Sequence, residues 1–589
     1  MEKLTALRNL MSTRGIDAYI ISSEDAHATE YTTDYWKTRQ WLSGFKGSRA
    51  DVVVTQKAAG LWTDGRYFIQ AAKELEGSGI ELFKMSEPGV PTYQAFVRDN
   101  IPRTAIVGFD GRTMAASEFE MLKKALQEKN ITYMYQEDLV GKIWSNRPMM
   151  PTTAAFEHAP QFAGKSAAEK LADVRKVMAK NKTTVYLVTA LDNIAWLFNI
   201  RGNDIAHLPV SYAFALITDK TADLFIDPAK VEKIASKLTA QGVTLNEYNA
   251  LPAALKHIDP LATVYYHPEK TNMILVDAIP KTCTIQKSAR KDIIYLMKAT
   301  KTETELTNIK NAYIKEGIAL TKTLKWFSET IKRQPMHESD FEDKLIENRK
   351  LQPHYIGDSF SAICAFGANA ASMHYRADGR GALIQPNGFF LVDTGAQFLD
   401  GTTDTTRTIP LGELTDEMRR DYTLVLKGNI ALSMAVFPEG TVGTQLDMLA
   451  RQPVLSHGMN YKSGTGHGIG YCLGVHEGPH RISVLLNPTE LKPGMLVSNE
   501  PGVYKEGRYG IRIENILYVK PHIENDDGIF MKFGVLTYTP IDTTPIIVEM
   551  LTTQERAFLN AYHQRTYEVL APHLDADEKI WLEKMTQAV

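Results

Sequence analysis

Hydrophobic residues recur at helical spacing at the start of the chain, and short apolar runs bounded by turn residues follow them. Leu4, Leu7 and Met11 fall on one face of a helix, because a period of 3.6 residues brings positions three and four apart together. The strand-like segments that follow span residues 17–22, 41–55 and 59–68. A second helix is predicted over residues 68–75. The N-terminal part is therefore predicted to be an α/β unit.

The same order of elements returns in the next part of the chain. A helix is predicted over residues 167–180, and apolar runs follow at residues 184–189, 211–218 and 222–227. The similarity predicts two copies of one α/β unit. The linker between them is predicted near residues 143–156, which contain proline and serine.

A third part begins with a long amphipathic helix. Thr302 and Glu305 have the spacing of a capping box, and apolar positions continue with helical period to Phe327. Strands rich in β-branched and aromatic residues are predicted within residues 388–395, 405–412, 494–504 and 510–519. We therefore predict three domains, which span residues 1–148, 149–295 and 296–589.

The composition is that of a soluble globular chain. Of 589 residues, 44% are hydrophobic and 23% are charged, which argues against disorder, collagen or coiled coil. The net charge of -3 lacks the positive excess that is typical of proteins that bind nucleic acid or an anionic membrane. Cys283, Cys364 and Cys472 form no CxxC pair, so neither a zinc knuckle nor a disulfide framework is indicated. With no signal peptide and no apolar run near the roughly 20 residues that span a bilayer, we expect a cytoplasmic protein.

Two aspartates of the third part interrupt apolar strands, where an unpaired carboxylate is costly. Asp393 ends one apolar run, and Asp404 follows eleven residues later beyond a loop bracketed by glycines. If the strands fold back symmetrically about residues 398 and 399, the two aspartates become direct cross-strand neighbours on one face. Like charges so placed persist only by sharing a proton or binding a cation. A turn carboxylate at Asp404 and a loop cap at Asp393 would explain the pair equally well when taken alone.

Two glutamates have similar positions. Period-two alternation places Arg512 and Glu514 on one face of a strand and Ile511 and Ile513 on the other. An ion pair of Glu514 with Arg512 or a neighbouring strand is the alternative. Glu500 closes another apolar strand, and the proline after it favours extended backbone. A simple turn carboxylate is the alternative for Glu500.

Histidines complete the set. His467 lies in the segment GTGHGIG, whose alternate glycines allow close backbone approach. The segment lacks the Lys-Ser or Lys-Thr pair of a phosphate loop. His374 and His476 are separate candidates, although a single histidine is more often a structural residue than a ligand.

The combination is more specific than its members. Four carboxylates and one imidazole occur in a single domain in the order Asp, Asp, His, Glu, Glu. A catalytic zinc ion uses about three protein ligands. Five ligands therefore favour two divalent ions, with a water between them acidified toward hydroxide. Oxygen ligands with one nitrogen favour Mn²⁺, with Co²⁺, Zn²⁺ or Fe²⁺ as alternatives.

The motifs GFFLVDTG, TTDTTRT, GTGHGIG, VHEGP, SNEPGVY and GIRIENI closely resemble those of the creatinase/aminopeptidase superfamily, peptidase family M24. The N-terminal segments DAYIISSEDAHATEY, SGFKGS and WTDGRYFIQAAK are similar to its long, three-domain cytosolic type, so the resemblance covers essentially the whole chain. It implies an α/β (α+β) protein with two creatinase-like N-terminal domains and a C-terminal pita-bread metallopeptidase domain. The implied function is a metal-dependent aminopeptidase that hydrolyses the first peptide bond of short peptides with proline at the second position.

The resemblance also implies roles for individual residues. The implied ligands of two metal ions, usually manganese, around an attacking hydroxide are Asp393, Asp404, His467, Glu500 and Glu514. Glu500 would also accept and pass on the proton. His374 and His476 would bind substrate and stabilise the oxyanion. Arg512 would support the metal carboxylates, and Phe360 would line the proline pocket.

One position departs from the pattern. Relatives commonly carry a histidine four residues before the His467 ligand, where this chain has Ser463. The metal ligands are unaffected, but the departure puts in question how tightly proline is held. The resemblance alone also implies a homodimer. A prolidase-like Xaa-Pro dipeptidase and a non-catalytic peptide-binding module stay as alternatives, although such prolidases usually have two domains and such modules lose metal ligands.

Overall fold

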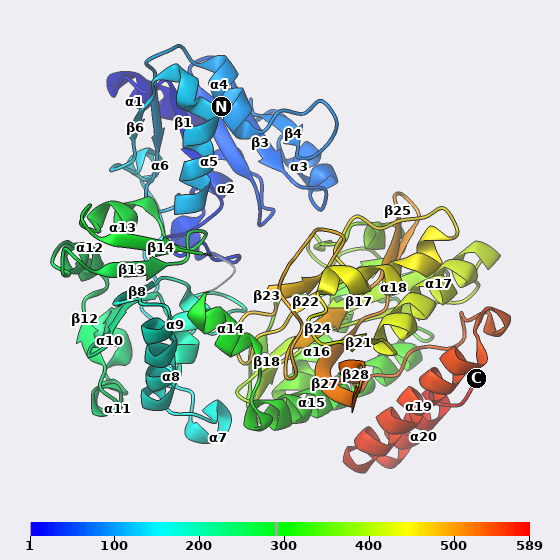
Figure 1. Cartoon of the computed structure of the whole chain (residues 1–589). Coiled ribbons are helices and arrows are strands. Elements are labelled where there is room, and N and C mark those ends of the chain that lie inside the picture. The colour runs from blue at the N-terminus through cyan, green and yellow to red at the C-terminus, as the bar shows by residue number, and fades with distance from the viewer. Residues whose placement is uncertain (1, 289–291) are drawn as a thin grey trace. The chain divides into compact units, whose positions relative to one another are not determined.

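The computed structural model describes residues 2–288 and 292–589 (Figure 1). Contacts divide the chain into two compact units, one made of Met1–His158 with Lys165–Ile294 and the other of Ala159–Gly164 with Tyr295–Val589. The domain ranges 1–148, 149–295 and 296–589 stay predictions, and residues 289–291, just before the last boundary, lie outside the described residues. No helix of the described part is both long and apolar enough to cross a membrane.

The first sheet of the N-terminal unit has the strand order β4-β3-β2-β1-β5-β6. Its strands are β1 (Ala18–Ile21), β2 (Asp51–Thr55), β3 (Ala59–Thr63), β4 (Glu81–Lys84), β5 (Ile106–Phe109) and β6 (Thr132–Met134). Its helices are α1 (Glu2–Thr13), α2 (Thr38–Ser43), α3 (Phe68–Glu74), α4 (Tyr93–Asn100), α5 (Ala116–Leu126) and α6 (Leu139–Ile143). Leu7 and Met11 of α1 share one hydrophobic core with Val52 and Val54 of β2.

Two predicted segments of this sheet are wrong in part. The strand expected over residues 59–68 ends at Thr63. The strand expected over residues 41–55 is confined to β2, and residues 41–43 belong to the helix α2. Short apolar runs cannot be assigned to helix or strand by periodicity alone. Gly44, with φ +81°, ends α2 in the left-handed region, which only glycine adopts without strain.

The second sheet repeats the first. Its order, β12-β11-β10-β8-β13-β14, matches the first sheet strand for strand, and the antiparallel and parallel pairings fall at the same places. Its strands are β8 (Val185–Val188), β10 (Ala213–Thr218), β11 (Ala222–Ile226), β12 (Thr244–Asn246), β13 (Thr263–Tyr266) and β14 (Thr284–Lys287), and β7 (Phe156–Glu157) pairs with β9 (Ile200–Arg201) outside it. Its helices are α8 (Ala167–Lys180), α9 (Leu191–Leu197), α10 (Pro228–Val231), α11 (Ala235–Ala240), α12 (Leu251–Lys256) and α13 (Met273–Ala278). The predicted duplication of an α/β unit is confirmed.

The C-terminal unit is built from antiparallel strand pairs and long helices (Figure 1). Its strands are β15 (Tyr355–Asp358), β16 (Ile363–Phe366), β17 (Phe389–Thr394), β18 (Ala396–Phe398), β19 (Gly401–Thr402), β20 (Thr405–Pro410), β21 (Val436–Pro438), β22 (Gly466–Gly468), β23 (Glu477–Ile482), β24 (Leu496–Asn499), β25 (Gly502–Lys505), β26 (Tyr509–Arg512), β27 (Asn515–Asn525) and β28 (Gly528–Val535). Its helices are α7 (Pro160–Ala163), α15 (Glu303–Thr330), α16 (Glu338–Lys350), α17 (Asp416–Ser433), α18 (Gly443–Leu455), α19 (Thr553–Leu570) and α20 (Ala576–Met585), and α14 (Ile293–Ala299) spans the division between the units. The predicted capping box at Thr302 and Glu305 starts α15.

Aromatic packing fixes β17, the strand that carries the first predicted ligand. Phe390 of β17 stacks on Phe327 of α15 with ring centroids 5.1 Å apart and meets Phe341 of α16 edge-on. All three rings are buried in one core, and each such burial stabilises the fold by about 1.5–3 kcal/mol. The start of β17, three residues before Asp393, is therefore packed against two helices.

The hairpin after β17 has a different register from the one expected. Asp393 pairs with Thr406 rather than with Asp404, so the expected symmetry about residues 398 and 399 is wrong. The strands β18 and β19 close around a two-residue turn at Leu399 and Asp400, and turn length fixes hairpin register. Asp404 consequently lies in the break between β19 and β20.

Candidate metal centre

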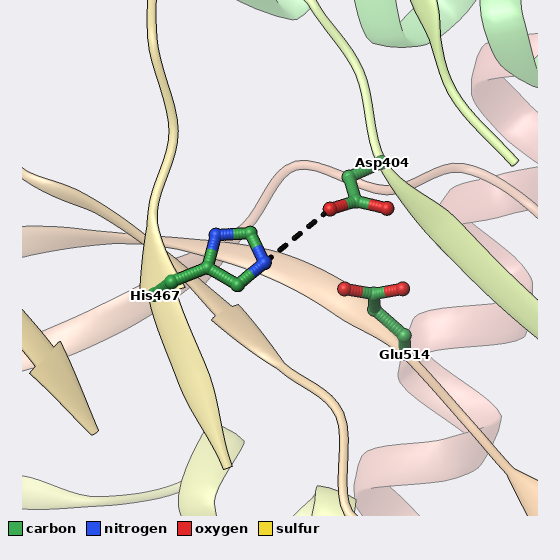
Figure 2. Close-up of side chains that lie close together, drawn as sticks. All are labelled: Asp404, His467 and Glu514. Carbon is green, nitrogen blue, oxygen red and sulfur yellow. Dashed lines mark ion pairs between the residues drawn. The ribbon is translucent and has the colours of Figure 1, made fainter. Parts of the chain in front are cut away.

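Three of the predicted ligands converge. Ligand atoms of Asp404, His467 and Glu514 all lie within 4.8 Å of one another (Figure 2). Asp404 precedes β20, His467 is the central residue of β22, and Glu514 lies between β26 and β27. Two positions next to strand ends and one short strand thus bring residues from three distant parts of the sequence together.

The glycines beside His467 allow β22 to lie directly against other backbone. A Cβ on Gly466 would lie 1.9 Å from the backbone oxygen of Ser498, and a Cβ on Gly468 would lie 2.2 Å from that of Glu477. The close approach expected from the alternate glycines is therefore present. The Nδ1 atom of His467 lies 2.9 Å from the carbonyl oxygen of Gly468. In the neutral ring Nδ1 then carries the proton, and Nε2 presents its lone pair to the carboxylates.

Glu500 follows β24 directly and faces the same imidazole. Its Oε1 atom lies 3.3 Å from Nε2 of His467 and accepts a hydrogen bond of 3.1 Å from the Ser498 hydroxyl. Its backbone N–H donates to the carbonyl oxygen of Thr465. Burial raises the pKa of Glu500 to about 7, although the Arg512 guanidinium acts in the opposite direction.

Asp393 has one satisfied and one unsatisfied carboxylate oxygen. Arg512 donates from Nη2 to Oδ2 of Asp393 at 2.5 Å and from Nη1 to the hydroxyl of Tyr504 at 2.8 Å. Oδ1 of Asp393 is buried and has no hydrogen-bond partner among the described residues. A buried acceptor left unpaired costs about 1–3 kcal/mol or more when charged, so this oxygen fits a cation.

Thr406 holds the carboxylate of Glu514, a role that the sequence did not reveal. The hydroxyl of Thr406 donates to Oε2 of Glu514 at 2.8 Å and accepts from Nε of Arg512 at 3.1 Å.

The predicted alternation of residues 511–514 is present, since Ile511 and Ile513 face a hydrophobic core while Arg512 and Glu514 share the polar side. The segment is not one strand, however, because β26 ends at Arg512 and β27 begins after Glu514.

The electrostatics of this cluster favour bound cations. Burial raises the pKa of Asp404 well above its ordinary value, and the neighbouring Glu514 and Asp393 raise it further. Burial likewise raises the pKa of Glu514, and Glu500 adds to the effect. Carboxylates so close together stay ionised only when cations offset their charge. The oxygen-rich donor set with one imidazole therefore fits divalent metal ions.

Of the remaining predicted residues, His476 lies beside this cluster, and Phe360 and His374 are described by the elements around them. The ring of His476, which is exposed, meets the ring of His467 edge-on with centroids 4.3 Å apart. Phe360 is half-buried and packs on the hydrophobic cluster that contains Tyr313. His374 follows the 3-10 helix Gly367–Ala371, which packs on the β25–β26 hairpin. Their roles in substrate binding stay predictions.

Comparison with known families accounts for most of the chain. Models of the creatinase/prolidase N-terminal domain match residues 3–137 and 146–305, the metallopeptidase family M24 model matches residues 281–521, and the model of the C-terminal region of peptidase M24 matches residues 529–589. The chain belongs to the aminopeptidase P group of metallopeptidase family M24 and is an enzyme.

Individual relatives sharpen this assignment. The chain is 37% identical over 610 residues to the probable Xaa-Pro aminopeptidase P of Paracoccidioides brasiliensis (strain Pb03), covering 100% of this chain and 99% of the relative. The crystal structure of X-prolyl aminopeptidase from Caenorhabditis elegans, a cytosolic enzyme with a di-nuclear active site, matches with a TM-score of 0.95 and 32% identity over 100% of this chain and 99% of that one. The Xaa-Pro dipeptidase from Bacillus anthracis shares the fold, with a TM-score of 0.52 and 23% identity over 64% of this chain and 99% of its own. The predicted class, creatinase-like domains before a pita-bread metallopeptidase domain, is confirmed.

Proposed function

We propose that this protein is an Xaa-Pro aminopeptidase, which removes the first residue of short peptides when proline stands second. The convergence of Asp404, His467 and Glu514 within 4.8 Å carries the proposal. The full-length similarity to aminopeptidase P supports the substrate class. Proline lacks an amide N–H and has a fixed φ, so a dedicated pocket is needed to accept it.

Two divalent ions are the cofactor that this donor set fits. The residues that would hold them are Asp393, Asp404, His467, Glu500 and Glu514. We propose Mn²⁺ as the metal, with Co²⁺, Zn²⁺ or Fe²⁺ as alternatives, because oxygen donors predominate. When bound, the ions would supply an acidified water and polarise the peptide carbonyl.

The protein's own groups would move the proton and orient the substrate. Glu500, whose pKa lies at about 7 in the metal-free protein, would accept the proton of the attacking water and pass it on. His476, exposed beside His467, and His374 would donate hydrogen bonds to the substrate and to the developing oxyanion. Arg512 holds the Asp393 carboxylate in place, and Phe360 would line the proline pocket.

Two alternatives have specific objections. A prolidase-like dipeptidase would use the same ligands, but the dipeptidase structure spans only 64% of this chain. A non-catalytic peptide-binding module would not need a glutamate with a pKa near neutrality. Nor would it need the buried Oδ1 of Asp393, which has no hydrogen-bond partner in the described part of the chain.

A short peptide panel tests the proposal directly. Arg-Pro-Pro should be cleaved and the dipeptide Arg-Pro should not, whereas a dipeptidase would show the reverse. A matched peptide with alanine in the second position should be cleaved more slowly than the proline peptide. Mild chelation should abolish turnover and Mn²⁺ should restore it, and a protein that shows no metal-dependent hydrolysis of any of these peptides would disprove the assignment.

We further propose a cytoplasmic homodimer. The description of the Caenorhabditis elegans enzyme as cytosolic supports the location. Exposed apolar side chains support an interface on the C-terminal unit: Met448, Leu449, Val484, Leu485 and Leu486. Light scattering on the parent chain and on the Leu485→Glu variant tests this, since a dimer that this surface forms should dissociate in the variant.

A further inference from the structure

Arg407, on β20, is buried and only 4% exposed. Its guanidinium makes hydrogen bonds through Nε, Nη1 and Nη2. Across residues 2–288 and 292–589, none of its acceptors is a carboxylate. They are backbone carbonyl oxygens, one side-chain amide oxygen and one phenol oxygen. Arg512, by contrast, is paired with the carboxylate of Asp393.

One edge of the Arg407 side chain fixes the main chain of Glu514. Nη1 of Arg407 donates to the carbonyl oxygen of Glu514 at 2.6 Å and to that of Thr406 at 2.8 Å. The N–H of Glu514 donates to the same Thr406 carbonyl at 3.1 Å. The N–H and the C=O of Glu514 are therefore both held, while its carboxylate is held by the Thr406 hydroxyl.

The other edge contacts the C-terminal segment. Nη2 of Arg407 donates to the Tyr562 hydroxyl at 2.8 Å and to the carbonyl oxygen of Thr539 at 2.7 Å. Nε donates to the carbonyl oxygen of Pro540 at 3.0 Å. Tyr562 belongs to α19 and in turn donates to Thr539 at 2.6 Å. A single planar cation thus joins the candidate ligand Glu514 to a helix near the end of the chain.

A buried charge without a counter-ion is costly unless it satisfies several strong acceptors. Only a guanidinium offers five donors in a fixed planar fork, and an ammonium cannot reproduce that arrangement. Neighbours of metal ligands commonly control metal affinity by orienting them. We propose that Arg407 is a positioning residue, which makes the affinity of the metal centre depend on its hydrogen bond to Tyr562 of the C-terminal helix α19.

This inference rests on the proposed function only in so far as it requires a metal centre at Glu514. The test is calorimetric titration of metal-free full-length protein with Mn²⁺. Arg407→Lys keeps the positive charge but lacks the planar set of N–H donors. It should weaken Mn²⁺ binding by about 10- to 100-fold. Tyr562→Phe removes one hydroxyl from the same contact and should weaken binding less, in the same direction. Excess Mn²⁺ should restore turnover in both variants.

Lys427→Gln is the matched control. Lys427 on α17 holds α19 through Glu555 at 2.7 Å and does not contact Glu514. The control should lower the melting temperature and leave Mn²⁺ affinity within about twofold of the parent. Parent-like affinity in both Arg407→Lys and Tyr562→Phe, or an equal loss in Lys427→Gln, would overturn the inference. If Arg407→Lys does not fold, Tyr562→Phe alone decides. A parent protein that binds no Mn²⁺ would instead count against the proposed function.

Discussion

The Nε2 atom of His467 lies 3.3 Å from Oε1 of Glu500, on the ring edge opposite the nitrogen that contacts Gly468. A neutral imidazole and an ionised carboxylate at this distance repel each other through their lone pairs. A proton between them removes this repulsion, and so does a metal ion. Protons and metal ions therefore compete for the same place, which makes metal binding depend on pH.

The stabilisation by metal should increase as pH rises. Burial raises the pKa of Asp404, Glu500 and Glu514, so the metal-free folded state binds more protons than the unfolded chain. Its stability then falls as pH rises from the ordinary carboxyl pKa to about 7 and beyond. The difference in melting temperature between Mn²⁺-loaded and chelated protein should be small near about pH 5 and larger near about pH 8. A difference that stays constant over this range, measured by differential scanning fluorimetry, would contradict the linkage.

Asp404→Asn should abolish hydrolysis without unfolding the chain. The amide removes a ligand and also a buried charge, so the metal-free variant should melt at or above the temperature of the metal-free parent. Asp400→Asn is the control, because Asp400 pairs with Lys315 rather than with the cluster. The control should melt at a lower temperature and keep its turnover. Near-normal turnover in Asp404→Asn would refute its assignment as a ligand.

Thr406→Val should impair catalysis through Glu514. The change removes the hydroxyl that joins Arg512 to the Glu514 carboxylate, at a cost of about 1–3 kcal/mol in stability. A fall in kcat/KM of about 10-fold or more is expected, from the loss of ligand orientation. Thr405→Val serves as the control, since among residues 2–288 and 292–589 the Thr405 hydroxyl donates to the backbone carbonyl of Asp404 and to no ligand carboxylate. Equal effects of the two substitutions would argue against a specific role for Thr406.

A buried histidine should contribute to acid unfolding. Burial, assisted by the charge of Arg407, lowers the pKa of His563 to about 4, and its Nε2 accepts a hydrogen bond from the N–H of Ile541. The stability it contributes is complete above its unfolded pKa of about 6.5 and is lost as pH falls toward 4, by about 3 kcal/mol in total. His563→Gln should flatten this part of the pH dependence in urea unfolding, and the exposed His522→Gln should not. An unchanged slope in His563→Gln would disprove the assignment.

Ser463→His should sharpen selectivity for proline. Ser463 is half-buried, and its carbonyl accepts a hydrogen bond from Arg451, so the backbone at this position is held. An imidazole there would add a wall to the proposed proline pocket. The ratio of kcat/KM between proline and alanine peptides should rise, whereas Ser463→Ala should leave the ratio near that of the parent. An unchanged ratio for Ser463→His would place position 463 outside the pocket, and a fall would contradict the expected direction.

Local signals in the sequence predicted local structure well. The capping box at Thr302 and Glu305 involves residues three apart, and it starts α15 as expected. The glycines on either side of His467 predicted that other backbone packs closely against this segment. The structure shows such contacts at Gly466 and Gly468. The duplicated α/β unit was predicted because apolar runs bounded by turns survive as a pattern even where residue identity is low.

Register and long-range polar contacts could not be predicted in the same way. The pairing of Asp393 with Thr406 depends on a two-residue turn at Leu399 and Asp400, and the Asp400-Gly401 pair indicates a turn here without fixing its register. The contacts of Arg407 join positions more than 100 residues apart in sequence, and a threonine or arginine in a strand carries no local sign of such a partner. The sequence therefore indicated the ligand types but not the residues that hold them.

The acceptors of Arg407 are mostly main-chain oxygens, and every residue type supplies a main-chain oxygen. Substitutions around residues 539 and 540 would therefore leave the arginine anchored wherever the backbone keeps its path. A truncation that removes α19 would also remove Tyr562, which contacts both Arg407 and Thr539. A C-terminal truncation or fusion tag is therefore expected to change how much metal the protein binds. The proposed ligands themselves end at Glu514 and are left unchanged.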